Sequence, residues 1–337
     1  MPRSGSQVLI CDLPVRFDTY SGCSHGCKYC FTQNKINLNN IKRAETKGAL
    51  KSFIDGFRNQ EVAWCDWDIP LHWSGMSDPF QPIEKTEKNS LECLELFAET
   101  RYPFIVSTKG RIIAERHYLE LFKSCKCIIQ ISMACSSYDV MEPGAPKFIE
   151  RLQMAEKLSG TGKRVIVRLQ PYLTSVKDEV INNLKAIREA GVYGVTIEGM
   201  KRKKKCPGTV RLGGDHVYPK GILRRDFAEI REAAKAVGLK FYCAENRLRD
   251  MGDSLCCCGV NDGEEGFETN KANMNHWVND KSGFAYTDKM KEDCTGAWAA
   301  HGFKQTTRGG RVFVKLSYER IMGVLLKDKK YLNQMSG

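Results

Sequence analysis

The chain has 337 residues and a formal net charge of +12, with 42% hydrophobic and 27% charged residues. This length fits one large domain with an extension, or two modest domains, and the composition excludes a wholly disordered chain. No apolar run approaches the roughly 20 residues that a membrane-spanning helix needs. Residues 1–7 lack the apolar stretch of a secretory signal, so we expect a cytoplasmic protein without a membrane partner. The positive charge permits a polyanionic partner such as nucleic acid, although many basic proteins bind none.

Strand-like runs alternate with helical patterns as far as residue 243. In residues 177–190, for example, Val180, Leu184 and Ile187 recur at helical spacing, and Gly191 is a typical helix stop. Such alternation predicts βαβ units around a parallel sheet. The number of units favours an α/β fold with a partial (β/α)6 barrel of the TIM type, whose sites lie at the carboxyl ends of the strands. We expect strands at residues 8–10, 64–72, 104–107, 128–132, 165–169, 195–197 and 239–243, and helices at 91–99, 116–122, 147–158, 177–190 and 225–237.

The periodicity fades after residue 243, where Gly, Asp, Asn, Cys and Trp become frequent. We therefore divide the chain into a core, residues 1–243, and a cysteine-rich irregular extension, residues 244–337. The chain has fifteen cysteines. An odd number in a chain of this length argues against a disulfide framework, and the clustered spacing indicates metal ligands instead.

The first cysteine group is Cys23, Cys27 and Cys30, spaced C-x3-C-x2-C in a glycine-containing loop. Three thiolates on a short loop can ligate three irons of a cubane 4Fe-4S cluster. The fourth iron then stays open to the amino and carboxylate groups of S-adenosylmethionine (SAM). A zinc knuckle is the alternative, but zinc usually takes four protein ligands in a structural site. We interpret His25 as a loop residue.

The spacing resembles the signature of the radical SAM superfamily, C-x3-C-x-aromatic-C, with Tyr29 in the aromatic position. Four further segments resemble the spore photoproduct lyase–like group of that superfamily. They read SGMSDPFQPIE at residues 74–84, VSTK at 106–109, EPGAP at 142–146 and RLQP at 168–171. The resemblance implies a radical SAM barrel that binds a 4Fe-4S cluster and SAM. It also implies an electron donor such as flavodoxin or ferredoxin, and cleavage of SAM to a 5′-deoxyadenosyl radical.

The resemblance also assigns roles to individual residues. Tyr29 would contact the adenine side of SAM, and Gly75 and Asp78 would meet its amino group. Lys109 and Ser132 would hold its carboxylate and ribose, and Arg168 would make a further polar contact. Lysine and arginine donors suit a carboxylate, and each of these residues follows or ends an expected strand.

Two positions depart from the lyase itself. Where the lyase has the cysteine that returns a hydrogen atom, this chain has Met76, and where the lyase has a tyrosine, it has Phe31. A thioether has no S–H bond and a phenyl ring has no O–H bond. We therefore expect a chain that shares the lyase fold but does not repair spore photoproduct. The sequence identifies no catalytic side chain.

A second cysteine group lies in and next to the extension. Neighbouring residues of an extended segment point to opposite sides, so Cys256 and Cys258 can share a face from which Cys257 points away. With Cys243 and Cys294 they would supply four ligands for a second iron–sulfur cluster or a zinc ion. A set of core thiols is the alternative.

Five cations, residues 201–205, follow the expected strand at 195–197, where the active site should open. A run of this kind is usually a solvated face, but its position makes a phosphate-bearing substrate a reasonable hypothesis. We therefore expect a radical SAM enzyme that modifies or repairs a nucleic acid or nucleotide. The alternatives are a radical SAM enzyme acting on a peptide or small molecule, and a non-catalytic iron–sulfur or zinc nucleic-acid-binding protein.

Overall fold

The computed structural model describes residues 1–261, 264–296, 313–329 and 332. A seven-stranded parallel sheet forms its centre, and the strands follow one another in the sheet in the same order as in the chain. Crossovers of one hand then place every connecting helix on the same face, which makes a barrel and not a doubly wound sheet. The predicted α/β class and partial barrel are confirmed. The strands are β1 (Arg16–Phe17), β4 (Leu71–Trp73), β5 (Phe104–Thr108), β6 (Cys127–Ser132), β7 (Arg164–Tyr172), β8 (Gly194–Gly199) and β12 (Lys240–Cys243).

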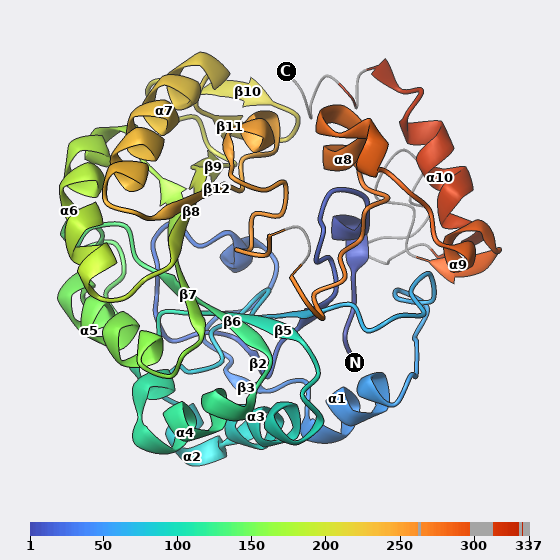
Figure 1. Cartoon of the computed structure of the whole chain (residues 1–337), viewed down its shortest axis with the longest axis horizontal. Helices are drawn as coiled ribbons and strands as arrows, with labels where there is room; N and C mark the ends of the chain where they lie inside the picture. The colour runs from blue at the N-terminus through green and yellow to red at the C-terminus, as the bar shows by residue number, and fades with distance from the viewer. Residues whose placement is uncertain (262–263, 297–312, 330–331, 333–337) are drawn as a thin grey trace.

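Helices α3 to α7 form an arc around the outer face of this sheet (Figure 1). Each buries one apolar stripe against the strands; in α6 the stripe is Val180, Leu184 and Ile187, as the spacing predicted. The five helices expected from the sequence are all present. The helices of this part of the chain are α1 (Lys47–Ile54), α2 (Glu84–Glu87), α3 (Asn89–Thr100), α4 (Arg116–Ser124), α5 (Phe148–Ser159), α6 (Lys177–Glu189) and α7 (Lys220–Ala236). Short 3-10 helices are η1 (Gly5–Leu9), η2 (Phe31–Asn34), η3 (Arg111–Ala114), η4 (Ser136–Tyr138) and η5 (Thr174–Val176).

Two strand predictions were wrong. Residues 8–10 lie in and after η1, and the first strand of the sheet is β1. A short apolar run indicates that its residues are buried, as Val8 and Leu9 are. It does not indicate which backbone conformation they adopt. In residues 64–72 only the last two belong to a strand. The guanidinium of Arg58 takes the carbonyls of Cys65 and Trp67 as acceptors, so these groups bond to a side chain and not to a neighbouring strand.

The basic run begins in a small antiparallel sheet that the sequence interpretation missed, and residues 203–205 lie in the loop after its first strand. Its strands are β9 (Lys201–Arg202), β10 (Val210–Leu212) and β11 (Asp215–Val217), in the order β10-β11-β9. Strands β10 and β11 are joined by Gly213 and Gly214, and Gly213 has a φ of +58°. A Gly-Gly pair between two short runs is a hairpin signal, which could have been recognised.

The extension is more ordered than predicted. Within the described residues it contains η6 (Asn246–Met251), α8 (Met274–Asn279), η7 (Lys281–Gly283), α9 (Asp288–Lys291), a β13–β14 pair (Cys294–Gly296 and Val314–Leu316) and α10 (Tyr318–Leu325). Figure 1 shows α8, α9 and α10 on the side of the molecule opposite the arc of α4 to α7. Asn270 and Asn275 donate to the carbonyls of Val8 and Ile10 at 2.8 and 2.6 Å. The start of the chain is therefore held by its extension.

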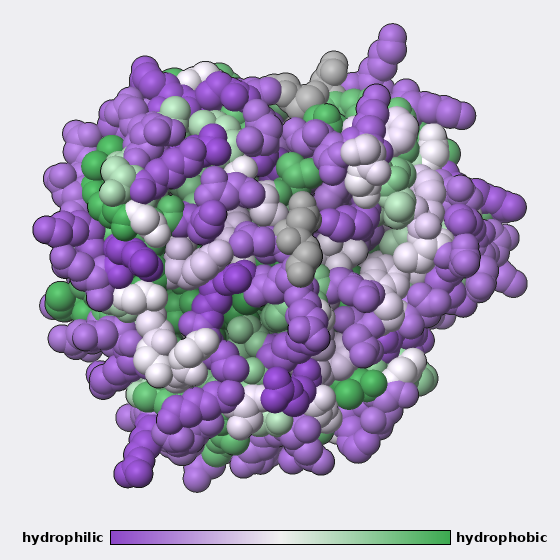
Figure 2. All heavy atoms as spheres, in the orientation of Figure 1, coloured by the Kyte–Doolittle hydropathy of each residue, from purple (hydrophilic) through white to green (hydrophobic). Residues whose placement is uncertain are grey.

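None of the described helices is both long and apolar enough to cross a membrane. The face shown in Figure 2 is mainly hydrophilic, with apolar residues in small scattered patches.

A last pair of strands, β2 (Tyr20–Ser21) and β3 (Lys42–Arg43), lies just beyond the carboxyl end of β1. It anchors the two ends of the loop that carries the first cysteine group.

Candidate functional site

The loop with Cys23, Cys27 and Cys30, called the cluster loop below, lies between β2 and η2 at the carboxyl end of β1. Its entry depends on Gly22, which has a φ of +83° and whose added Cβ would lie 2.8 Å from the Asn40 carbonyl oxygen. All three cysteines are partly exposed residues. Burial raises the pKa of Cys27, and the neighbouring Lys109 ammonium opposes that rise. The loop therefore presents three accessible sulfurs beside a cation.

Among the described residues, no three cysteine, histidine, aspartate or glutamate side chains converge as they would around one metal ion. A cubane cluster does not require such convergence, because each thiolate binds a different iron. Electrostatic coupling of Cys27 to both Cys23 and Cys30 shows that the three sulfurs share one neighbourhood. The donor set therefore fits a cubane cluster better than a single ion.

His25 joins the cluster loop to two other segments of the site. Its Nδ1 lies 3.1 Å from the Gly144 carbonyl oxygen, and its Nε2 lies 3.1 Å from Asp78 Oδ2. Both ring nitrogens therefore face groups of the protein. Gly144 is required at its position, because an added Cβ would lie 2.3 Å from the Ser24 carbonyl oxygen.

The carboxylate of Asp78 is fully used by the protein. It accepts hydrogen bonds from Thr108 Oγ1 at 2.7 Å and from the backbone amides of Phe80 and Lys109 at 2.9 and 2.6 Å. Burial alone would raise the pKa of Asp78, but His25 and these donors lower it to about 2. Asp78 thus fixes the cluster loop to the end of β5.

The backbone amide of Gly75 also forms its hydrogen bond within the protein. The amides of Gly75, Met76 and Ser77 donate to Asp18 Oδ1 at 2.8, 2.8 and 3.2 Å. Asp18 directly follows β1 and was missed by the sequence interpretation; burial raises its pKa. The predicted contacts Gly75 and Asp78 therefore shape the turn between β4 and α2.

Three predicted SAM contacts meet around Glu142, another residue to which no role had been given. Tyr29 donates its hydroxyl hydrogen to Glu142, and Lys109 Nζ lies 3.7 Å from Glu142 Oε1 and 5.8 Å from the centre of the Tyr29 ring. The completely buried Arg151 places Nη1 2.6 Å from Glu142 Oε2 and donates to the Ser132 carbonyl at 2.7 Å. This group, called the Glu142 cluster below, draws together the cluster loop, β5, β6 and α5.

Arg168 lies apart from the Glu142 cluster, inside the barrel. Its guanidinium donates to Ser107 Oγ at 3.0 Å, to Gln130 Oε1 at 2.8 Å and to Gln170. Gln170 in turn donates to Glu198, which pairs with Lys201 at the start of the basic run. A continuous polar chain therefore leads from the lumen to the β9–β11 sheet.

The structure does not gather the four cysteines predicted for the second metal site. Cys256 and Cys258 lie with Cys257 and with Cys11. Cys243 ends β12, and its thiol lies 3.8 Å from the Glu245 carbonyl oxygen. Cys294 lies in β13, where burial raises its pKa and the charged groups acting on it are Lys289, Asp293 and Glu292. The prediction that Cys257 points away is also not met, because its Sγ is 4.0 Å from that of Cys258.

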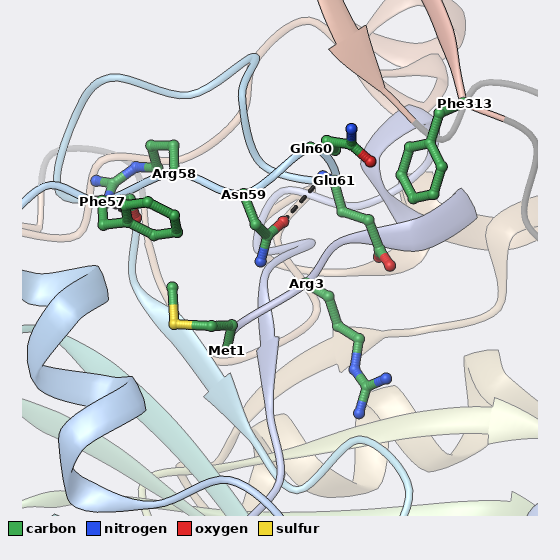
Figure 3. Close-up of a pocket in the computed structure, with 8 residues that line it drawn as sticks. All are labelled: Met1, Arg3, Phe57, Arg58, Asn59, Gln60, Glu61 and Phe313. Carbon is green, nitrogen blue, oxygen red and sulfur yellow. Dashed lines mark hydrogen bonds between the residues drawn. The ribbon is translucent and has the colours of Figure 1, made fainter.

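A separate surface hollow of about 520 Å³ lies between the start of the chain and the loop after α1 (Figure 3). No predicted site residue lines it. Glu61 lines it, and the Glu61 amide donates to Asn59 Oδ1 at 2.9 Å. The residues that line the hollow are Met1, Arg3, Phe57, Arg58, Asn59, Gln60, Glu61 and Phe313.

The fold defined by these strands and helices is that of the radical SAM enzymes. A structure of a spore photoproduct lyase variant with bound AdoMet and dinucleoside spore photoproduct superposes with a TM-score of 0.56 and 16% identity, covering 72% of this chain and 78% of that one. SuiB of Streptococcus suis bound to S-adenosylmethionine gives a TM-score of 0.52 and 11% identity, over 97% of this chain and 69% of that one. The resemblance to this class is thus confirmed at the level of the fold.

No protein-family model matches the chain. Uncharacterized proteins of Mycobacterium tuberculosis and Mycobacterium bovis are 26% identical to it over 228 residues, or 63% of this chain. The matched region spans 66% of the length of these relatives.

The Glu142 cluster predicts a large stability effect. Glu142→Gln leaves the buried Arg151 guanidinium without its counter-charge, so we expect the free energy of unfolding to fall by about 3 kcal/mol. The exposed Lys51–Asp55 pair, 2.6 Å apart, provides the control, since Asp55→Asn should change stability by less than about 1 kcal/mol. Urea unfolding of the three proteins measures both values. Equal losses in the two variants would contradict the role given to Glu142.

Proposed function

We propose that the chain is a radical SAM enzyme that holds a 4Fe-4S cluster through Cys23, Cys27 and Cys30. The observation that carries this proposal is the cluster loop itself: three accessible thiols beside Lys109, at the carboxyl edge of a barrel with the radical SAM fold. When bound, the cluster supplies the electron that splits the sulfonium carbon–sulfur bond of SAM and leaves a 5′-deoxyadenosyl radical. An external one-electron donor is needed, and we propose a flavodoxin or ferredoxin.

The residues of the chain bind and orient SAM. Lys109 is held between Glu142 and the Tyr29 ring, and this position supports a role in which its ammonium meets the SAM carboxylate. Tyr29 would lie along the adenine side, and Ser132 would meet the ribose from the end of β6. Their positions around the Glu142 cluster support these roles.

The remaining proposed SAM contacts act at other places. Gly75 and Asp78 would shape the turn that receives the SAM amino group, since the Gly75 amide and the Asp78 carboxylate already bond within the protein. Arg168 would close the lumen side of the SAM site. Met76 is partly buried and Phe31 exposed, and neither side chain has an S–H or O–H hydrogen to relay. We therefore propose a reaction outcome different from that of spore photoproduct lyase.

We further propose that the substrate is a nucleic acid or nucleotide. Burial, and after it the charges of Arg16 and Lys203, lower the pKa of Lys35, and the Asp215 carboxylate opposes this shift. Arg16 in β1 and Lys203 in the basic run are therefore within electrostatic reach of Lys35 at the end of η2. Phe31 is 52% exposed, with Lys35 Nζ 5.1 Å from its ring centre. An exposed ring beside converging cations suits a stacked base and its phosphate.

Part of the basic run is neutralised within the protein. Lys201 pairs with Glu198, and Lys203 lies 2.8 Å from Asp215. Within the residues that the structure describes, no ion pair involves Lys204 or Lys205, and both are exposed. Arg202 is exposed as well, and its side chain donates to Cys206 Sγ and not to a carboxylate. The charge offered to a phosphate backbone therefore comes mainly from Arg202, Lys204, Lys205 and Lys35.

The proposed cofactor chemistry predicts a simple loss of activity. Replacing Cys23, Cys27 and Cys30 together by Ala should abolish formation of 5′-deoxyadenosine from SAM after anaerobic reconstitution and reduction. Cys125→Ala, which removes a buried thiol after α4, should retain it. Product analysis by mass spectrometry measures the yield. If wild type yields no 5′-deoxyadenosine, the non-catalytic alternative replaces this proposal.

The proposed substrate predicts a change in salt dependence. Replacing Lys204 and Lys205 by Ala should weaken binding of labelled DNA or RNA and reduce the log–log salt slope by up to about 2, because fewer counterions are released. The control removes the same charge from the outer helices, with Lys157→Ala in α5 and Lys185→Ala in α6. Titrations at several salt concentrations give both slopes. Indistinguishable slopes would favour a peptide or small-molecule substrate.

A further inference from the structure

Arg16 lies in β1, and its side chain extends along the inner face of the barrel. The next residue, Phe17, packs on the outer side against Phe97 of α3, with the ring centres 6.4 Å apart. Neighbouring residues of a strand point to opposite faces, so Arg16 faces inward. A Cβ added to Gly75 would lie 2.8 Å from Arg16 Cδ. The end of the Arg16 side chain therefore lies beside the turn at residues 75–77, at the carboxyl end of the barrel.

The guanidinium of Arg16 has no counter-charge bonded to it. Within the described residues it forms neither an ion pair nor a hydrogen bond, and its Nε is buried. Asp18 is a carboxylate within its electrostatic reach, but Asp18 Oδ1 already accepts three backbone amides. Burial raises the pKa of Asp18, and neither these amides nor the charge of Arg16 reverses the shift. A partly buried guanidinium in this setting favours the binding of an external anion.

The groups next to Arg16 on the inner face add positive charge or none. His72 stands opposite Arg16 in the neighbouring strand β4. Burial, followed by the charges of Arg168 and Arg16, lowers the pKa of His72 well below its usual range, so its imidazole is neutral at pH 7. His72 Nε2 lies 3.1 Å from Ser107 Oγ, to which Arg168 donates at 3.0 Å. In the part of the chain that the structure describes, the acceptors of Arg168 are a hydroxyl and two amide oxygens, and none is a carboxylate.

Lys35 brings a second cation to Arg16 from the side of the cluster loop. It directly follows η2, and after burial the charge of Arg16 is the largest influence that lowers its pKa. Its Nζ lies 5.1 Å from the centre of the exposed Phe31 ring, and it pairs with no carboxylate of the described residues. A phosphomonoester carries about −1.5 to −2 charges at pH 7, whereas an internal phosphodiester carries one negative charge. Two cations without counter-charges therefore match a terminal phosphate better than an internal one.

We propose that Arg16 and Lys35 bind a terminal phosphate, the phosphomonoester of a nucleotide whose base stacks on Phe31. This inference rests on the proposed function and narrows its substrate to a free nucleotide or the phosphorylated end of a strand. Arginine suits the role because its planar guanidinium can donate two parallel hydrogen bonds to a phosphate. Since Gly75 shapes the turn proposed to receive the SAM amino group, the bound nucleotide would lie next to SAM.

The test measures the affinity of full-length protein, with its cluster reconstituted, for the four deoxynucleoside 5′-monophosphates by calorimetry. The corresponding nucleosides, and dinucleosides joined by one internal phosphodiester, should bind more weakly than the best monophosphate. Arg16→Gln should weaken binding of that monophosphate by about tenfold or more, because a charge-assisted contact is lost, and Arg16→Lys should weaken it less. Arg116→Gln removes an exposed arginine at the start of α4 and is the matched control, for which we expect unchanged affinity.

Three results would overturn the proposal. The first is equal affinity of wild type and Arg16→Gln for the monophosphate, and the second is equal affinity of wild type for monophosphate and nucleoside. The third is weaker binding of SAM, and not of the monophosphate, by Arg16→Gln, which would assign the guanidinium to the SAM carboxylate.

The same titrations separate this proposal from the proposed function. Salt-dependent binding of DNA or RNA without Arg16-dependent binding of a monophosphate would overturn the terminal-phosphate site and leave the substrate class standing. Binding of inorganic phosphate that depends on Arg16, without binding of any nucleotide or nucleic acid, would overturn the substrate class and retain the phosphate site.

A second measurement uses wild-type protein and does not depend on the folding of variants. Phenylglyoxal modifies accessible arginines, and Arg16 is partly exposed while Arg116 is exposed. The monophosphate should protect Arg16 from modification and leave Arg116 reactive, as located by peptide mass spectrometry. Equal modification of Arg16 with and without the monophosphate would contradict the site.

Discussion

The buried carboxylate of Glu142 is the group on which the geometry of the candidate site depends. A carboxylate that is 3% exposed is stable only with a counter-charge and with donors for its oxygens. Arg151, Tyr29 and Lys109 supply them, and each comes from a different element. The three contacts that neutralise and hydrogen-bond the Glu142 carboxylate therefore hold the cluster loop against β5 and α5.

The contacts around Asp78 fix the other side of the cluster loop in the same manner. Its oxygens are shared among His25, Thr108 and backbone amides, so this carboxylate holds the loop instead of facing the solvent. Asp18 does the same for the turn at residues 75–77. Much of the polar character in the segments at residues 74–84, 106–109 and 142–146 thus serves to position the three thiols.

A chain of hydrogen bonds connects the two ends of the barrel. It runs from Lys201 through Glu198 and Gln170 to Arg168, and from there through Gln130 to the Cys258 carbonyl. Residues that would meet the substrate are therefore linked to the segment that closes the amino-terminal end. The extension is remote in sequence from the cluster loop, but through this chain of hydrogen bonds it contacts side chains of the same barrel lumen.

The sequence by itself determined the features that are local. The strands at 104–107, 128–132 and 165–169 were predicted because β-branched runs between amphipathic helices have few alternatives. The cluster loop was recognised because its three cysteines lie within eight residues. The strand expected at 64–72 was mostly wrong, because the Arg58 side chain donates hydrogen bonds to two backbone carbonyls there that a strand would need for its neighbour. Only the tertiary structure decided which distant groups meet. One example is the ion pair of Glu142 with Arg151, and another is the position of Cys11 next to Cys256–Cys258. Both contacts depend on the path of the chain through the folded barrel, which cannot be deduced from spacing along the sequence.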